Sequence, residues 1–154
     1  MSGSRSQRTW SEGVLATNIG YHIAQAEVTT MRLYFSHIGE PLALRPVEYS
    51  LLMLLLANDE MTPKQLSQAL ALPAPSLTML VDRLHERGLV DRVRSETDRR
   101  SQRVLLTADG RRLALQASER SPQMDAELDG VLSQGEQMML TELLLKVARL
   151  SAKE

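Results

Sequence analysis

The chain has 154 residues, of which 43% are hydrophobic and 3% aromatic, and its formal net charge is −1. This length suits one compact domain, and a core built mainly from Leu, Met, Val and Ala favours packed helices over a β-sandwich. The absence of cysteine excludes disulfides, thiolate metal sites and thiol-based redox sensing. The longest apolar run, residues 51–57, is far shorter than the roughly 20 residues of a membrane span, and residues 1–8 lack a signal-peptide apolar segment, so we expect a cytoplasmic protein.

Two helices are predicted in the first third of the chain. The first covers residues 11–38, which contain no proline and carry an apolar arc broad enough to be buried on two sides. Gly39 and Pro41 are expected to end this helix. The second covers residues 45–58 and has Pro46 in its first turn, where a missing backbone N–H costs nothing.

The next two helices are predicted to form a helix-turn-helix unit. The shorter one, residues 62–70, begins with a capping box in which Thr62 and Gln65 each bond the backbone N–H of the other residue. The longer one runs from about Pro75 to Arg87, and Gly88 ends it. Its apolar residues recur at helical spacing: Leu77, Leu80, Val81 and Leu84. The remaining faces of this helix are free to enter a groove of DNA.

Two short strands around a charged turn are predicted next. Residues 89–93 and 104–106 can pair as strands, while residues 94–101 are too polar to bury and must project into solvent. Seven arginines and four acidic residues lie between positions 83 and 103, a net charge of +3 against −4 for the rest of the chain. This distribution favours contact with phosphates, although an ordinary solvated charged face would give the same count.

The C-terminal part is predicted to be helical. Thr107 is a candidate N-cap of a helix that reaches about Glu119, until Pro122 kinks or interrupts it. A further helix starts after Ser133 and carries an apolar stripe over residues 139–150. Neither terminal helix can hide its apolar surface in a monomer, so we expect both chain ends to pack against a second copy in a homodimer.

Four ordered blocks of this sequence resemble the MarR (multiple antibiotic resistance regulator) family of winged helix-turn-helix transcription factors. They are Leu44-Arg45-Pro46-Val47-Glu48-Tyr49, Met61-Thr62-Pro63-Lys64-Gln65-Leu66, residues 80–90, and Asp98-Arg99-Arg100 with Leu106-Thr107 and Gly110. The resemblance covers residues 42–113. It implies a mainly α protein with a small β-hairpin wing. It also implies that residues 1–154 form one MarR-like domain. Within it, residues 42–107 would form the DNA-binding lobe, and residues 9–40 and 108–154 the dimerisation helices.

The resemblance also implies a function and a set of DNA contacts. The protein is expected to bind double-stranded DNA sequence-specifically, as a homodimer on a pseudo-palindromic operator, and to regulate transcription, with repression the commoner outcome in the family. The recognition helix would contact DNA through Pro75, Ser76, Thr78, Met79 and Arg83. Relatives frequently hold arginine at the position of Met79, so methionine here predicts A·T-rich half-sites; the alternative is that Met79 is a core residue.

In the predicted wing, the family pattern pairs Asp98 with Arg100, the carboxylate fixing the guanidinium. Arg94 and Arg99 would reach phosphate or sugar, and Arg99 or Arg100 can enter a narrow minor groove. The alternative is a salt bridge that only stiffens the hairpin.

A small aromatic or phenolic effector is implied by the same resemblance, in a cleft between the dimer helices and the winged lobe. Candidate lining residues, each of which could equally be plain packing or surface, are Tyr21, His22, Tyr34, Arg45, Tyr49 and Met53. No cofactor and no metal site are expected, although His37 and Glu40 lie close in sequence.

The two alternatives to a DNA-binding regulator are an enzyme and a module that binds only protein. An enzyme is disfavoured because the three histidines lie far apart and the motifs His-Glu-x-x-His and Gly-x-Ser-x-Gly and a glycine-rich phosphate loop are absent. The remaining alternative is a winged-helix module that binds protein and does not bind DNA.

Overall fold

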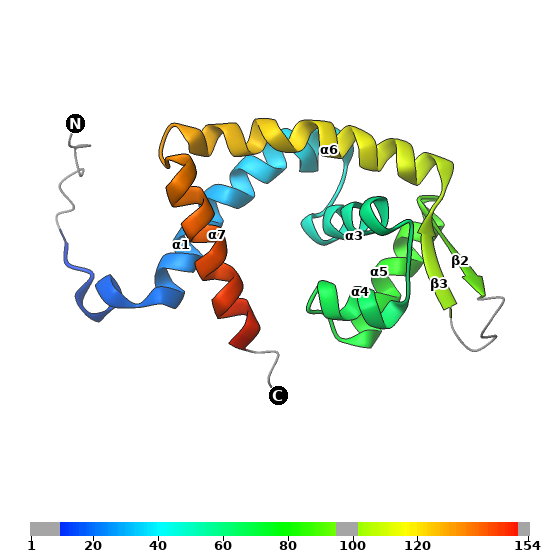
Figure 1. Cartoon of the computed structure of the whole chain (residues 1–154), viewed down its shortest axis with the longest axis horizontal. Helices are drawn as coiled ribbons and strands as arrows, with labels where there is room; N and C mark the ends of the chain where they lie inside the picture. Colours follow the sequence, from blue (N-terminus) through cyan, green and yellow to red (C-terminus); the bar gives the residue numbers. More distant parts are fainter. Residues whose placement is uncertain (1–9, 95–101, 151–154) are drawn as a thin grey trace. The chain divides into compact units, whose positions relative to one another are not determined.

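The computed structural model describes residues 10–94 and 102–150, which fall into two compact units, residues 1–33 and 34–154 (Figure 1). The first unit holds a 3₁₀ helix, η1 (Gly13–Thr17), and most of helix α1 (Ile19–Tyr34). The helix predicted over residues 11–38 is therefore broken near its start. The break lies at Asn18, whose extended backbone ends η1 and whose side chain accepts a hydrogen bond from Tyr21 N at 2.8 Å.

The second unit begins with the last residue of α1 and contains the rest of the helices and a small sheet. Its elements are η2 (Phe35–Gly39), α2 (Glu40–Leu42), α3 (Pro46–Asn58), β1 (Glu60–Met61), α4 (Pro63–Ala69), α5 (Ala74–Glu86), β2 (Val90–Arg94), β3 (Gln102–Leu106), α6 (Ala108–Asp129) and α7 (Gln134–Ala148). Within residues 10–94 and 102–150, no helix combines the length and the apolar character needed to cross a bilayer.

The expectation that Gly39 and Pro41 end the first long helix is wrong. The chain continues through the π-helical turn η2 into α2, and it leaves the helical path only at Ala43, whose φ is 50°. Gly39 is needed for close packing instead, because a Cβ there would lie 2.6 Å from Cδ1 of Phe35. Pro41 sits in the first turn of α2, where its missing N–H is tolerated.

The predicted hairpin is part of a three-stranded antiparallel sheet with strand order β1-β3-β2. Strands β2 and β3 pair from Val90 opposite Leu106 to Arg94 opposite Gln102. The additional strand β1 pairs Glu60 with Leu105. With only two residues, β1 is too short to show an alternating pattern, which is why sequence analysis missed it.

The core of the second unit is made mainly by aliphatic side chains from α3, α4, α5 and the sheet. Tyr34, Ile38 of η2, and Ala114 and Ala117 of α6 complete it. Leu77 and Leu84 of α5 are at most 2% exposed, and Leu80 and Val81 are 3% exposed. The predicted stripe of α5 is thereby confirmed as its inner face. Burying a leucine contributes about 1.5–3 kcal/mol, so this stripe fixes the outer face of α5 toward solvent.

Helix α6 packs along α3 and continues past Pro122 to Asp129, so the predicted interruption at this residue does not occur (Figure 1). Pro122 is exposed, so its ring clears the core. Contacts on both sides of it hold the helix together despite the lost hydrogen bond. The hydroxyl of Tyr49 in α3 donates to Oγ of Ser121 at 3.2 Å, and Nε2 of His37 in η2 lies 2.8 Å from Oε1 of Glu127.

The predicted helix starts at Thr62, Thr107 and Ser133 are confirmed. The hydroxyl oxygen of each accepts a hydrogen bond from the backbone N–H three residues on, which belongs to Gln65, Gly110 and Glu136. The Ser133 hydroxyl and backbone N–H in turn donate to the carboxylate of Glu136, and these bonds lower the pKa of that carboxyl.

Candidate nucleic-acid interface

Helices α4 and α5 with the turn between them form a helix-turn-helix whose outer face carries most of the predicted recognition residues. The turn is fixed by Ala71, whose φ is 51°, and by a hydrogen bond from Leu72 N to Ser67 O at 3.0 Å. Pro75, Ser76, Thr78 and Met79 are all exposed on α5. Met79 is 64% exposed, so it is not a core residue of this chain.

The hydroxyls on this face differ in what they can offer a base edge. The Thr78 hydroxyl donates to Ala74 O at 3.0 Å, one turn back along α5. Its proton is therefore used within the helix, and its oxygen and methyl group are left for a ligand. A methyl group next to the Met79 side chain is suited to contact with thymine methyls.

Arg83 stands apart from the other predicted contacts. Its side chain is 39% exposed, and its Nη1 atom lies 3.7 Å from Oε1 of Glu48 in α3. Glu48 is itself 2% exposed. The structure thus brings Arg83 to a buried carboxylate at the inner edge of α5.

The predicted wing is described only at its base. Arg94 is exposed at the end of β2, while Asp98, Arg99 and Arg100 lie outside the described residues. Arg92 of β2 forms an ion pair with Asp82 of α5, which ties the base of the wing to the recognition helix. On the far strand, Nη1 of Arg103 lies 3.5 Å from Oε1 of Glu60 in β1.

These ion pairs change the interpretation of the arginine-rich stretch. Among the described arginines between positions 83 and 103, four are paired with acidic side chains of the same lobe: Arg83, Arg87, Arg92 and Arg103. Part of the +3 charge counted from sequence therefore serves to hold the lobe together. The partners Glu48, Glu60 and Asp82 were not predicted from the sequence, because Glu48 and Glu60 lie far from their arginines in the chain.

The candidate effector residues are divided between the two units. In the first unit, the rings of Tyr21 and His22 meet edge to face at 5.4 Å. In the second, Tyr34 is buried, its hydroxyl donates to Leu44 O at 3.0 Å, and its ring meets that of Tyr49 at 5.7 Å. Burial, and then the neighbouring carboxylate of Glu48, raise the pKa of Tyr34 far above its usual value, so the hydroxyl remains a donor.

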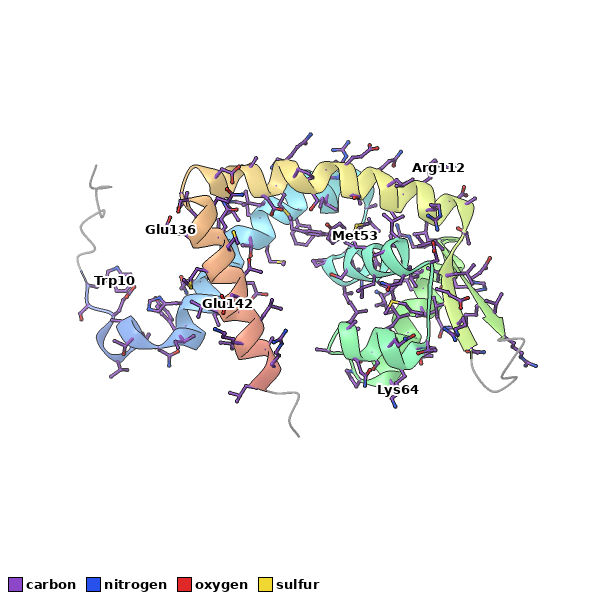
Figure 2. All side chains as sticks on the ribbon, viewed as in Figure 1. Trp10, Met53, Lys64, Arg112, Glu136 and Glu142 are labelled. Atoms are coloured by element: carbon purple, nitrogen blue, oxygen red, sulfur yellow. The ribbon has the colours of Figure 1, made fainter. Side chains whose placement is uncertain are left out.

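The other two candidates lie at the start of α3 and within it. Arg45 is exposed immediately before the helix, and Met53 is half-buried within it (Figure 2). A hollow of about 410 Å³ lies between α2 and α6 but involves none of the six candidates. It is lined by Leu42, Gln116, Glu119, Arg120 and Gln123.

A possible metal site at His37 and Glu40 finds no support in the geometry. His37 contacts Glu127. Among the residues that the structure describes, no three His, Asp or Glu side chains come together as a metal site would require.

A helix-turn-helix followed by an antiparallel strand pair defines the winged-helix class of DNA-binding folds. The family model described as the MarR family matches residues 44–101. The HTH-type transcriptional regulator MhqR of Bacillus subtilis (strain 168) is 34% identical over 114 residues, which cover 72% of this chain and 76% of that protein. The chain belongs to the MarR family of transcriptional regulators.

Two solved structures extend the similarity. The transcriptional repressor CouR bound to a 23-mer DNA duplex is 28% identical with a TM-score of 0.83, over 92% of this chain and 100% of that chain. NadR in complex with 4-hydroxyphenylacetate is 25% identical with a TM-score of 0.73, over 92% of this chain and 98% of that chain. MhqR and CouR are regulators of transcription, in agreement with the expectation of a regulator rather than an enzyme.

Proposed function

We propose that this protein is a homodimeric repressor that binds double-stranded DNA sequence-specifically and leaves it when a small aromatic or phenolic compound binds. The observation that carries the proposal is the exposed outer face of α5, backed by a fully apolar inner face and joined to the base of the wing by the Arg92–Asp82 ion pair. CouR, which is similar over nearly the whole chain, is a repressor bound to a DNA duplex.

Residues in the first two turns of α5 would contact the base edges. Ser76 can donate or accept at a base edge, and Pro75, Thr78 and Met79 offer apolar contacts to thymine methyls. No guanidinium lies on these turns to make a bidentate contact with guanine. We therefore propose A·T-rich half-sites.

The wing would contact the neighbouring minor groove. There Arg94 and Arg99 would contact phosphate or sugar, and Asp98 would orient Arg100 toward the groove floor. At the inner edge of α5, Arg83 would reach a phosphate from its position beside Glu48.

Dimerisation would supply the second half-site. None of the residues of α7, 134–148, is buried, and its exposed side chains are mostly apolar: Met138, Met139, Leu140, Leu143, Leu144, Leu145 and Val147. An exposed apolar surface of this size on a terminal helix normally marks an interface. A two-fold dimer with its recognition helices one DNA turn apart, about 34 Å, would read a pseudo-palindrome.

The proposed effector class is supported by NadR, which is similar to this chain and is complexed with 4-hydroxyphenylacetate. The candidate lining residues are Tyr21, His22, Tyr34, Arg45, Tyr49 and Met53. An effector needs to favour one spacing of the two lobes by only a few kcal/mol to release DNA. A panel of aromatic acids and phenols added to the protein–operator complex tests this; no change in operator affinity with any of them would contradict the effector class.

A gel-shift experiment tests DNA binding itself. Duplexes that the wild-type protein selects from a random pool should form a discrete complex, with log affinity falling steeply and linearly with log salt as counterions are released. They should also share an A·T-rich inverted repeat. No discrete complex with any duplex would favour the protein-interaction alternative, and a nearly flat salt plot would contradict phosphate contacts.

The wing assignment makes a separate prediction. Substituting Arg100→Ala should weaken binding to the selected duplex by about tenfold or more, because a minor-groove guanidinium and its phosphate neighbours act together. The circular dichroism spectrum and the dimer mass should stay unchanged. Unaltered affinity at fixed salt would contradict the role given to Arg100.

A further inference from the structure

A buried carboxylate joins the start of α3 to the C-terminal half of the recognition helix. Oε2 of Glu48 accepts hydrogen bonds from Arg45 N at 2.9 Å and from Nη1 of Arg87 at 3.1 Å, and Oε1 lies 3.7 Å from Nη1 of Arg83. Nη2 of Arg87 donates to Ala43 O at 3.0 Å, in the left-handed turn before α3. Arg87, the residue that ends α5, thus donates both to a carboxylate of α3 and to a backbone carbonyl of the turn before it.

Helix capping alone does not explain this arrangement. Glu136 caps the start of α7 with the same bond to the backbone three residues earlier, and it does so from a fully exposed position. Glu48 is only 2% exposed, and it also forms ion pairs with Arg83 and Arg87. Burying a charge is costly, and apolar residues of similar size often replace buried ion pairs without loss of stability. The cluster therefore calls for a reason other than stability.

The geometry of the cluster restrains α5 in two ways. Arg83 and Arg87 are four residues apart, so they lie one above the other on the same face of the helix. Two anchors on one face oppose rotation of α5 about its axis. The bond from Arg87 to Ala43 O opposes sliding of the helix along its axis. Met79 lies four residues before Arg83, one turn nearer the start of α5, and its side chain is exposed.

We propose that Glu48 is a positioning residue for DNA recognition: through Arg83 and Arg87 it sets the orientation of α5 against α3, and thereby the alignment of Ser76, Thr78 and Met79 with base edges. This proposal rests on the proposed function. Contacts to base edges depend on alignment, whereas attraction to phosphates tolerates small displacements. Glu48 should therefore govern the preference for the operator over other DNA, and not the general affinity for DNA.

Substituting Glu48→Gln separates the two affinities. The amide keeps the shape and can still accept from Arg45 N, but it no longer carries the charge that holds two guanidiniums. Affinity for the duplex selected by the wild-type protein should fall about tenfold or more, as expected for loss of one or two aligned base contacts. Affinity for a scrambled duplex of the same composition should stay equal or rise, because each subunit gains one positive charge.

The charge-matched control is Asp109→Asn. Asp109 is 66% exposed at the start of α6, where it pairs with Arg112, and its neutralisation also adds one positive charge. This variant should keep the ratio of the two affinities within about twofold of the wild type. A drop in the ratio equal to that of Glu48→Gln would assign the effect to net charge and overturn the proposal.

A second variant keeps the test decisive if Glu48→Gln folds poorly. Arg87→Lys retains the charge at a side chain that is 33% exposed, but an ammonium group cannot span both Glu48 Oε2 and Ala43 O as the guanidinium fork does. It should lower the ratio in the same direction. An unchanged ratio in a folded dimer of either variant would overturn the proposal. Unfolding of both variants would also overturn it, by assigning the cluster to stability.

These outcomes are distinct from a failure of the proposed function. If the wild-type protein itself shows no preference for any duplex, sequence-specific binding is refuted. If the wild type shows the preference and the variants share it, only the role of Glu48 is refuted.

Discussion

Replacing Leu140 and Leu144 of α7 with aspartate is expected to convert the protein from a dimer into a monomer and to abolish operator binding. The two side chains are 45% and 43% exposed in the single chain and lie four residues apart on one face of α7. Each leucine buried in an interface contributes about 1.5–3 kcal/mol, and an unpaired aspartate there adds a desolvation cost. Sedimentation velocity and gel shift measure the two effects.

The control for this variant is Lys146→Glu, which changes the net charge by the same amount. Lys146 pairs with Glu142 on the polar face of α7, and the two side chains are 63% and 60% exposed. It should remain a dimer and retain affinity for the operator within about threefold, since exposed ion pairs contribute little. A dimer of unaltered strength in the Leu140/Leu144 double variant would show that this stripe is not the interface.

Substituting Gly110→Ala is expected to destabilise the winged lobe by about 3 kcal/mol or more. A Cβ at this position would lie 1.8 Å from the carbonyl oxygen of Leu89 and 2.8 Å from its carbonyl carbon, both backbone atoms that cannot turn away. Helix α6 would have to move. That movement would break two hydrogen bonds of the Thr107 hydroxyl. It accepts from Gly110 N at 2.9 Å and donates to Gly88 O at 2.7 Å.

Urea denaturation and thermal melting measure this loss. The matched control is Gly130→Ala at the end of α6, where the φ is −74° and the nearest atom to an added Cβ is Glu127 O at 3.9 Å. There the change should be neutral or stabilising by up to about 1 kcal/mol, through the unfolded chain. A stability change below about 0.5 kcal/mol in Gly110→Ala would contradict the packing described for α6.

Features that depend on residues near one another in the chain were predictable. The capping residues Thr62, Thr107 and Ser133 were found because a cap and its partner lie three residues apart, and the buried stripe of α5 because helical spacing repeats within four. The MarR resemblance was carried by short blocks of the same kind. The order of the helices and the presence of the wing followed from these signals.

Features set by packing were not predictable from the chain. Pro122 and Gly39 are ordinary helix breakers, and only contacts across the fold, such as Tyr49 with Ser121, let the helices continue. Glu48 looked like any polar residue of a first turn, because its partner Arg87 is 39 residues away. Charge counting likewise could not distinguish arginines free to meet phosphate from those already paired.

A spacing experiment on the selected operator tests directly whether the two α5 helices of one dimer read two half-sites together. Sedimentation equilibrium should show a complex with two chains per duplex. Inserting about half a helical turn, roughly 5 base pairs, between the half-sites should reduce affinity nearly to that of scrambled DNA, since the second helix would then face the wrong side of the duplex. Equal affinity for the original and the lengthened operator, or one chain per duplex, would contradict this joint reading of the half-sites.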